Sequence, residues 1–195
     1  MSTEKNLNNT KPDINYQIEI STQTLERNLG FISNCDNKAS IILTAVGVLL
    51  TIILTNEGIN NIKKILEKCI FQMTFWGFVY TFVFFSSGII LILGILLLIS
   101  VLIARSGIGK KKETNKKKSL IFFGDINSYN TIADYNKEIK KTNKKEMLDD
   151  LISQIYINSK IATKKYRKFN LGLKLTVIGF FLFIGVVLLG HYIYI

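Results

Sequence analysis

The residue whose type and setting most directly suggest chemistry is Asp36, which interrupts an apolar stripe. The stripe steps by four and three residues through Leu25, Leu29, Ile32, Ala39, Leu43, Val46 and Leu50. These steps put every member on one face of a helix, so Asp36 is predicted to point into the interior of a helical bundle. A carboxylate in such a place is unfavourable unless a cation or a hydrogen-bond donor compensates it.

The partner of Asp36 must come from another segment of the chain. Lys38 lies about 200° around the helix from Asp36 and is predicted to extend outward. The cations expected near the same depth are Lys160, Lys164, Lys165 and Arg167. Two interpretations stay open: an ion pair that fixes the register of two helices, or one side of a ligand-binding or gating site.

No arrangement typical of catalysis is present in the sequence. The only histidine, His191, lies near the end of a long apolar segment, and no P-loop, HExxH or GxSxG motif occurs. Cys35 and Cys69 are expected at opposite ends of one membrane span, which argues against a disulfide or a zinc site. We therefore expect no enzyme activity, no metal and no cofactor.

Three apolar segments are long enough to position these residues in a membrane. A hydrocarbon core of about 30 Å needs roughly 20 apolar residues as a helix, and continuous apolar runs argue against barrel strands. The predicted spans are residues 39–55, 71–104 and 171–195. We predict an all-α integral membrane protein in which long helices continue from the spans into a cytoplasmic helical stalk.

The second apolar run exceeds one bilayer thickness. Its first residues are rich in aromatic side chains, which favours an aromatic belt at the membrane surface and a true span near 81–103. These side chains are Phe71, Phe75, Trp76, Phe78, Tyr80 and Phe82. The alternative is a hairpin of two short helices that bends at 86–88. Glycines in the spans offer points of close helix approach: Gly88, Gly94, Gly179, Gly185 and Gly190.

The distribution of charge predicts the orientation. Residues 105–170 carry seventeen Lys or Arg against seven acids, so this basic segment is predicted to be cytoplasmic. Residues 1–38, with four basic and five acidic side chains, are then a cytoplasmic segment and helix rather than a signal peptide, and 56–70 form a short outer connection. Because the positive charge lies between apolar runs, we expect anionic lipid and not nucleic acid as its partner.

A second stripe leads into the third span. It comprises Leu148, Ile152, Ile155, Ser159, Ala162, Tyr166 and Phe169. This pattern predicts a second long helix, which packs on the first or on another copy of the chain. Before it, Ser128 is predicted to be the N-cap of a short helix that ends near Lys141.

Three motifs in this order resemble the Pycsar effector transmembrane family. They are Asp-Asn-Lys-Ala-Ser at 36–40, Leu-Ile-Phe-Phe-Gly-Asp-Ile at 120–126, and Asp-Leu-Ile-Ser-Gln-Ile-Tyr at 150–156 leading to Lys165-Tyr166. The resemblance covers roughly residues 20–190. It implies an antiphage effector of the bacterial inner membrane, and our leading hypothesis is that this effector is a homo-oligomer. A partner nucleotide cyclase would make cyclic CMP or cyclic UMP on infection, and the effector would impair the membrane and cause abortive infection.

A cyclic nucleotide bound directly would need cations for its phosphate and an aromatic face for its base. The candidates are Lys160, Lys164 and Arg167 for the phosphate, Phe123 or Tyr156 for the base, and Asp36 or Asp125 for an amino group, with Gly124 allowing close approach and Lys38 nearby. Phe122 and Phe123 have an alternative role as a plug of a helix junction. The competing function is a membrane-anchored scaffold that presents the basic segment to a protein partner.

Overall fold

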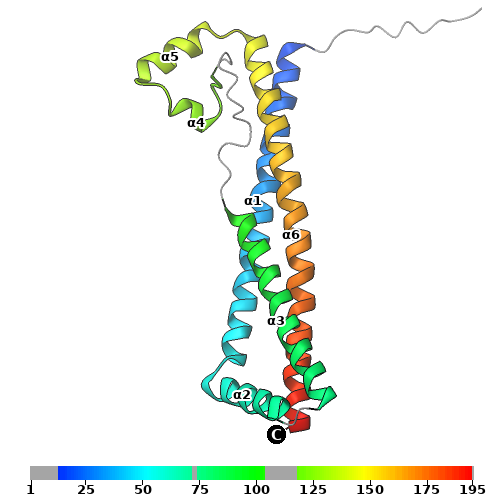
Figure 1. Cartoon of the computed structure of the whole chain (residues 1–195). Coiled ribbons are helices and arrows are strands. Elements are labelled where there is room, and N and C mark those ends of the chain that lie inside the picture. The colour runs from blue at the N-terminus through cyan, green and yellow to red at the C-terminus, as the bar shows by residue number, and fades with distance from the viewer. Residues whose placement is uncertain (1–12, 72–73, 104–117, 195) are drawn as a thin grey trace, which may run out of the picture. The chain divides into compact units, whose positions relative to one another are not determined.

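The computed structural model describes residues 13–71, 74–103 and 118–194, apart from the side chain of Tyr194. In these ranges the chain forms helices and no strand, which confirms the all-α prediction. The helices are α1 (Ile14–Ile53), α2 (Asn56–Phe71), α3 (Phe75–Leu102), α4 (Phe123–Ile126), α5 (Ile132–Lys141) and α6 (Lys144–Tyr194) (Figure 1).

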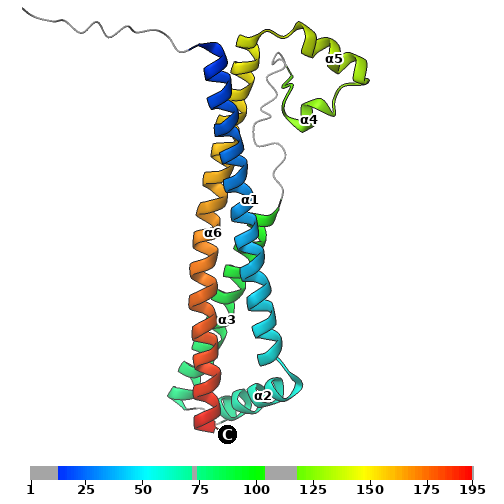
Figure 2. The same cartoon turned by 180° about the vertical axis from the view of Figure 1, so that it is seen from behind.

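The chain divides into two compact units. The first comprises Met1–Phe31 and Arg105–Ala162, and the second comprises Ile32–Ala104 and Thr163–Ile195. The two predicted long helices are confirmed, because α1 runs unbroken for 40 residues and α6 for 51 (Figure 2). Each of them contributes residues to both units.

Three helices, α1, α3 and α6, are long and apolar enough to cross a membrane. The run through residues 86–88 is continuous in α3, so the alternative of a bend between two short helices is wrong. The sequence placed Phe71 at the start of this span, but Phe71 is the last residue of α2. The extended backbone of Thr74, at φ −85° and ψ 143°, precedes the first turn of α3 and separates it from α2.

Within the second unit, α1, α3 and α6 meet in a small apolar core. Its buried members are Cys35, Ala39, Leu98, Val101 and Phe169. Cys35 and Ala39 are four residues apart on α1, and Leu98 and Val101 are three apart on α3, so each helix turns one face to this core.

The backbones of α3 and α6 approach closely because small residues line their contact. A Cβ atom at Gly179 would lie 2.5 Å from the Leu91 nitrogen, and one at Gly172 would lie 3.1 Å from the Leu98 nitrogen. Such contacts leave no room for a side chain. Among the glycines predicted to serve close approach, Gly94 and Gly179 do so, whereas Gly190 makes room for the side chains of Tyr80 and Ile65.

Two of the predicted glycines make no close helix contact among the described residues of the chain. A Cβ atom at Gly88 or at Gly185 would meet nothing within 4 Å. Spacing along a span therefore identified small residues correctly but not which face of the helix they occupy.

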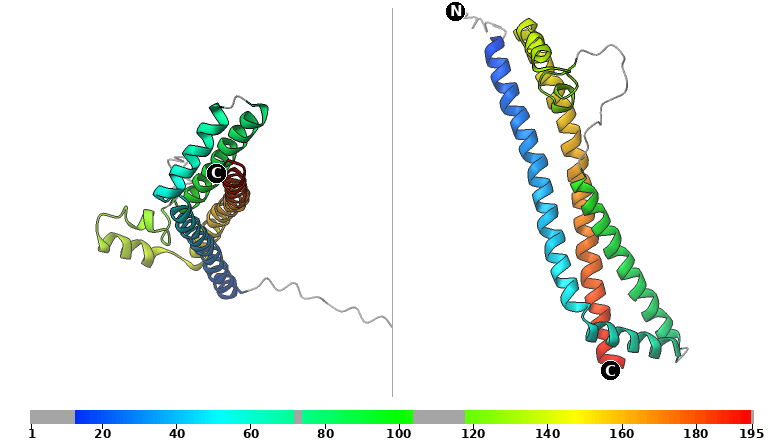
Figure 3. Two further views of the ribbon diagram at one scale, coloured as in Figure 1. Left: turned by 90° about the horizontal axis from the view of Figure 1, so that it is seen from below. Right: turned by 90° about the vertical axis from the view of Figure 1, so that its left-hand side faces the viewer.

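The segment expected as a short outer connection folds almost entirely as α2. This helix runs crosswise to α3 and to the portion of α6 in the same unit (Figure 3). Its Ile65 and Cys69 are 1% and 2% exposed. The Ile65 side chain lies beside Gly190 of α6, and the Cys69 backbone lies beside Gly77 of α3.

In the first unit, α5 begins three residues later than the sequence predicted. The N-cap is Thr131, whose Oγ1 accepts a hydrogen bond from the Asp134 backbone N–H at 3.1 Å and donates to the Asp134 carboxylate at 2.8 Å. The hydroxyl of Ser128 instead donates to the Asp125 carbonyl at 2.6 Å. The prediction of Ser128 as the cap was wrong, because Thr131 and Asp134 form the reciprocal pair that a helix start favours. The predicted end at Lys141 is confirmed.

Candidate functional site

The densest polar network of the first unit is centred on Ser119, which is only 8% exposed. Its hydroxyl donates to the Asp150 carboxylate at 3.0 Å and accepts from the Gln154 amide at 3.2 Å. The backbone N–H groups of Ile121 and Phe122 also donate to this oxygen, at 3.2 and 3.0 Å. One hydroxyl thus links the turn before α4 to α6.

Two carboxylates complete the network by accepting from backbone N–H groups. Asp150 accepts from Leu120 at 2.9 Å, and Asp125 of α4 accepts from the N–H of Ser119 at 3.0 Å. The hydroxyl of Tyr135 on α5 donates to the Leu120 carbonyl at 2.9 Å. Side chains of α4, α5 and α6 therefore form hydrogen bonds with backbone groups that would otherwise lack a partner.

The predicted site residue Gly124 has a local structural role. A Cβ atom there would lie 2.6 Å from Cε1 of Phe122, so glycine lets that ring lie against the backbone. The rings of Phe122 and Phe123 are 4.8 Å apart at their centroids, and Phe123 is 67% exposed. Phe123 therefore does not plug a helix junction, whereas Phe122 is half-buried beside Gly124.

Two further predicted site residues, Tyr156 and Lys160, lie together on α6. The Lys160 Nζ atom is 4.1 Å from the centroid of the Tyr156 ring, and both side chains are exposed. A cation over an aromatic face is a favourable pair that also leaves hydrogen-bond donors of the ammonium open to solvent.

The first unit also joins α1 to α6. The amide of Asn28 donates to the Ile155 carbonyl at 3.3 Å, and the Lys144 ammonium donates to the Asn15 side chain at 2.8 Å. These contacts support the prediction that the two long helices pack on each other.

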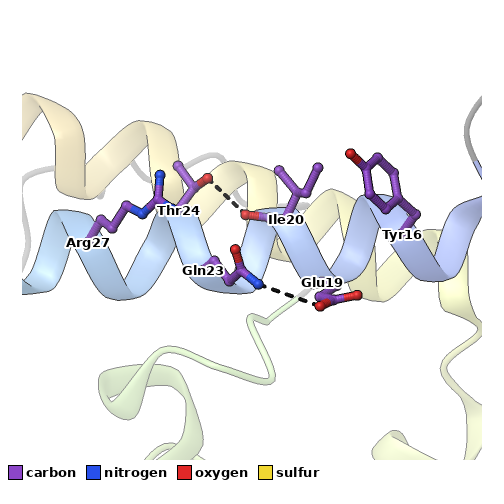
Figure 4. A pocket seen from close by; sticks show the side chains of 6 residues that line it. All are labelled: Tyr16, Glu19, Ile20, Gln23, Thr24 and Arg27. Carbon is purple, nitrogen blue, oxygen red and sulfur yellow. Dashed lines mark hydrogen bonds between the residues drawn. The ribbon is translucent and has the colours of Figure 1, made fainter.

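A hollow of about 360 Å³ lies along α1 in this unit (Figure 4). Its lining is Tyr16, Glu19, Ile20, Gln23, Thr24 and Arg27. The Gln23 amide donates to Glu19 at 3.5 Å and the Thr24 hydroxyl to the Ile20 carbonyl at 2.8 Å, so part of its polarity is satisfied within the helix. All lining residues belong to one helix, which makes this hollow a weaker candidate for a specific ligand than a set of groups converging from several elements.

In the second unit, Asp36 and Lys165 form the ion pair that the sequence required. The Lys165 Nζ atom lies 2.5 and 2.7 Å from the two carboxylate oxygens of Asp36. The Lys165 side chain is 8% exposed and that of Asp36 is 33% exposed. The predicted partner set contained Lys165, which was not among the residues assigned to the ligand. Lys38, Lys164 and Arg167 are all exposed.

A second contact between α6 and another helix lies one turn further along. The Lys168 ammonium donates to the Ser100 hydroxyl of α3 at 3.1 Å. Lys165 and Lys168 therefore bind α1 and α3 respectively from neighbouring turns of α6.

Cys35 precedes the first predicted span, which begins at Ala39, and it is fully buried beside the ion pair. Burial and then the adjacent Asp36 carboxylate raise the pKa of the Cys35 thiol above its ordinary value. The thiol is thus held in its unreactive form at neutral pH. Among the described residues, no three His, Cys, Asp or Glu side chains gather as a metal site would require.

The sequence prediction missed Ser119, Asp150 and Gln154. An apolar pattern does not reveal that Gln154 is buried and Asp150 partly buried, because both lie outside the apolar stripe of their helix. The family motifs could have indicated these residues, because Asp150 and Gln154 belong to the motif at 150–156 and Ser119 directly precedes the motif at 120–126.

Comparison with known proteins identifies the family. The family model described as the Pycsar effector protein domain matches residues 20–191, which is most of the chain. The chain belongs to the Pycsar effector family. Its sequence is 30% identical to the Pycsar effector protein GmPycTM of Gulbenkiania mobilis over 175 residues, covering 85% of this chain and 89% of that protein. No solved structure matches the chain significantly.

Membership in the Pycsar effector family confirms the resemblance stated from the three motifs. Together with three helices that are long and apolar enough to span a bilayer, it makes the chain a membrane protein of antiviral defence. The family is one of effector proteins.

Proposed function

We propose that this Pycsar effector responds to cyclic CMP or cyclic UMP made by a partner cyclase and then impairs the bacterial inner membrane, so that an infected cell stops growing. The supporting observation is that the three family motifs all bind α6 or belong to it. Asp150 and Gln154 hold the Ser119 turn that opens the second motif, and Lys165 holds Asp36 of the first. The proposed topology keeps the N-terminus and residues 105–170 in the cytoplasm, because that segment holds seventeen basic residues against seven acids.

The nucleotide site is proposed in the first unit. Lys160 would contact the phosphate and the exposed face of Tyr156 would stack on the pyrimidine, since a cation beside an aromatic ring matches the two ends of this ligand. Phe123, Gly124 and Asp125 of α4 are the second proposed group, because the Phe123 ring is exposed and Asp125 has a second carboxylate oxygen besides the one bound to Ser119.

A gating role is proposed for Asp36 and the cations near it. Lys38, Lys164 and Arg167 are exposed. Their charges would shift the equilibrium between a state in which the Asp36–Lys165 ion pair is formed and one in which it is broken. A ligand changes the population of two states only by its difference in affinity for them. The unbroken helix α6 carries both Tyr156 and Lys165, so one helix bears the proposed sensor and the proposed gate. Assembly of several copies is part of this proposal.

The test of sensing is direct binding of cyclic CMP and cyclic UMP to the purified full-length protein, with cyclic AMP and linear UMP as comparison ligands. Loss of a charged hydrogen bond in Lys160→Ala is expected to weaken binding by about 1.5–3 kcal/mol, roughly tenfold or more. Tyr156→Ala should weaken it as well. Lys145→Ala removes an exposed lysine of the same helix and should leave binding unchanged.

The test of function is the membrane potential of cells that carry this chain together with an inducible pyrimidine cyclase, read with a potential-sensitive dye. Depolarisation is expected only when both proteins are present, and Lys160→Ala should prevent it. An unchanged potential with either nucleotide would contradict the proposal and favour the alternative of a membrane-anchored scaffold.

A further inference from the structure

Helix α2 has an apolar arc that is wider than the surface covering it. At about 100° per residue, its apolar side chains other than the terminal Phe71 fall on one side of the helix and its charged side chains on the other. Ile65 and Cys69, toward one edge of the apolar side, are 1% and 2% exposed. The other edge of that side, formed by Ile59, Leu66 and Ile70, is uncovered: Ile59 is 38% exposed, Ile70 is 63% exposed and Leu66 is partly exposed.

The covered part of α2 rests on α3 and α6 of the same unit. A Cβ atom at Gly77 of α3 would lie 2.5 Å from the Cys69 carbonyl oxygen, and one at Gly190 of α6 would lie 3.0 Å from the Ile65 side chain. The backbone of each neighbour is therefore close to α2. These contacts fix which side of α2 faces protein and leave its second apolar edge facing away.

The surroundings of α2 indicate what covers this edge. The helix lies between the apolar run of α1, which ends at Ile53, and that of α3, which begins at Phe75. Since both neighbours are candidate spans, a helix between them that runs crosswise must lie at the surface of the bilayer (Figure 3). The first turn of α3 adds exposed aromatic rings of the type found at headgroup depth, with Phe75, Trp76 and Phe78 exposed by 74%, 72% and 70%.

The charges of α2 fit the same location. Lys63 borders the uncovered apolar edge, and Lys64 lies on the exposed polar side with Glu67. Lysines beside an apolar edge place their stems along acyl chains and their ammonium groups among lipid phosphates. A helix with this distribution is of the interfacial type, which lies in the plane of the membrane.

We propose that α2 is a membrane-surface helix whose edge Ile59, Leu66 and Ile70 is buried among the acyl chains of one leaflet, with Lys63 at the lipid phosphates. The partner of this surface is lipid and not a second protein chain. The inference does not depend on nucleotide sensing, because it uses only the packing of α2 and the membrane character of its neighbours.

The test is the accessibility of spin labels on the full-length protein in liposomes of phosphatidylcholine and phosphatidylglycerol. Single cysteines replace Ile59, Leu66 or Ile70 on the apolar edge and, as matched controls on the polar side, Asn60 or Glu67. The background carries Cys35→Ala and Cys69→Ala. Power saturation by oxygen, which concentrates in lipid, is compared with saturation by a water-soluble nickel chelate.

The ratio of oxygen to nickel accessibility should be several-fold higher at the three edge positions than at the two controls. Nickel accessibility at the edge equal to that of the controls would overturn the proposal, because α2 would then lie in water. Protection of the edge from both reagents would also overturn it, since a second copy would then cover this surface. Ile59 and Ile70 are exposed and Leu66 is partly exposed, so circular dichroism should show unchanged helix content. Three independent labels keep the result from depending on any one variant.

Discussion

Replacing Asp36 by alanine removes the partner of an ammonium group that has little contact with water. The Lys165 side chain is 8% exposed, and its Nζ atom lies 2.5 and 2.7 Å from the carboxylate oxygens. An exposed ion pair contributes about 0–1 kcal/mol, whereas removing one member of a buried pair costs about 3–5 kcal/mol. The burial of Lys165 puts Asp36→Ala near the lower end of the second range, at about 3 kcal/mol.

The opposite substitution should cost less, and this asymmetry follows from the structure. In Lys165→Ala the group left unpaired is the Asp36 carboxylate, which is 33% exposed and can be hydrated. The expected loss is about 1–2 kcal/mol, between the surface and the buried cases. In the double variant Asp36→Ala/Lys165→Met no buried charge remains, so its stability should exceed that of Asp36→Ala alone.

The assay is thermal unfolding of the purified protein in detergent, followed by helical circular dichroism. For a chain of this size each kcal/mol corresponds to roughly 2–4 °C, so Asp36→Ala should unfold about 6–12 °C below the parent. Lys164→Ala, which alters an exposed lysine next to Lys165, should change stability by no more than about 0.5 kcal/mol. Equal losses in the two single variants, or a double variant no more stable than Asp36→Ala, would refute this reasoning.

Three further predictions test other parts of the structure. Ser119→Ala should cost about 1–3 kcal/mol and speed hydrogen exchange of the backbone N–H groups that donate to its oxygen, while the exposed Ser128→Ala should leave those rates unchanged. Gly179→Leu should separate α3 from α6 and lower the yield of folded protein in size-exclusion chromatography, unlike Gly47→Leu, whose Cβ would meet nothing within 4 Å. Because its pKa is raised by burial, Cys35 should be alkylated by a maleimide more slowly than free cysteine at pH 8 and should gain reactivity only as pH rises further, as measured by mass spectrometry.

The sequence was sufficient to predict features that depend on one helix and its solvent. A single acid in an apolar stripe implied a buried cationic partner, and the structure provides it in Lys165. Length and continuous hydropathy likewise identified α1, α3 and α6 as candidate spans, because the thickness of a bilayer sets these requirements.

Features that depend on contact between distant segments were not predicted. Ile152 of the second stripe is 51% exposed, whereas the polar Gln154 is 6% exposed. The hydrogen bond from the Gln154 amide to Ser119 compensates for the loss of water on burial, and an apolar pattern assigns no burial to an amide. The pairing of Asp150 with Leu120 was hidden for the same reason, since a backbone N–H has no signature in the sequence.

The close contact of α3 and α6 contains a buried hydroxyl group without a hydrogen-bond partner among the described residues. Thr176 is 1% exposed beside Gly94, and within the described part of the chain its hydroxyl makes no hydrogen bond. A buried hydroxyl without a partner raises the free energy of the packing that contains it, by about 1–3 kcal/mol. An arrangement of α3 and α6 that offered the Thr176 hydroxyl an acceptor would remove this cost, so Thr176 is a place where a shift of one helix against the other would be favoured locally.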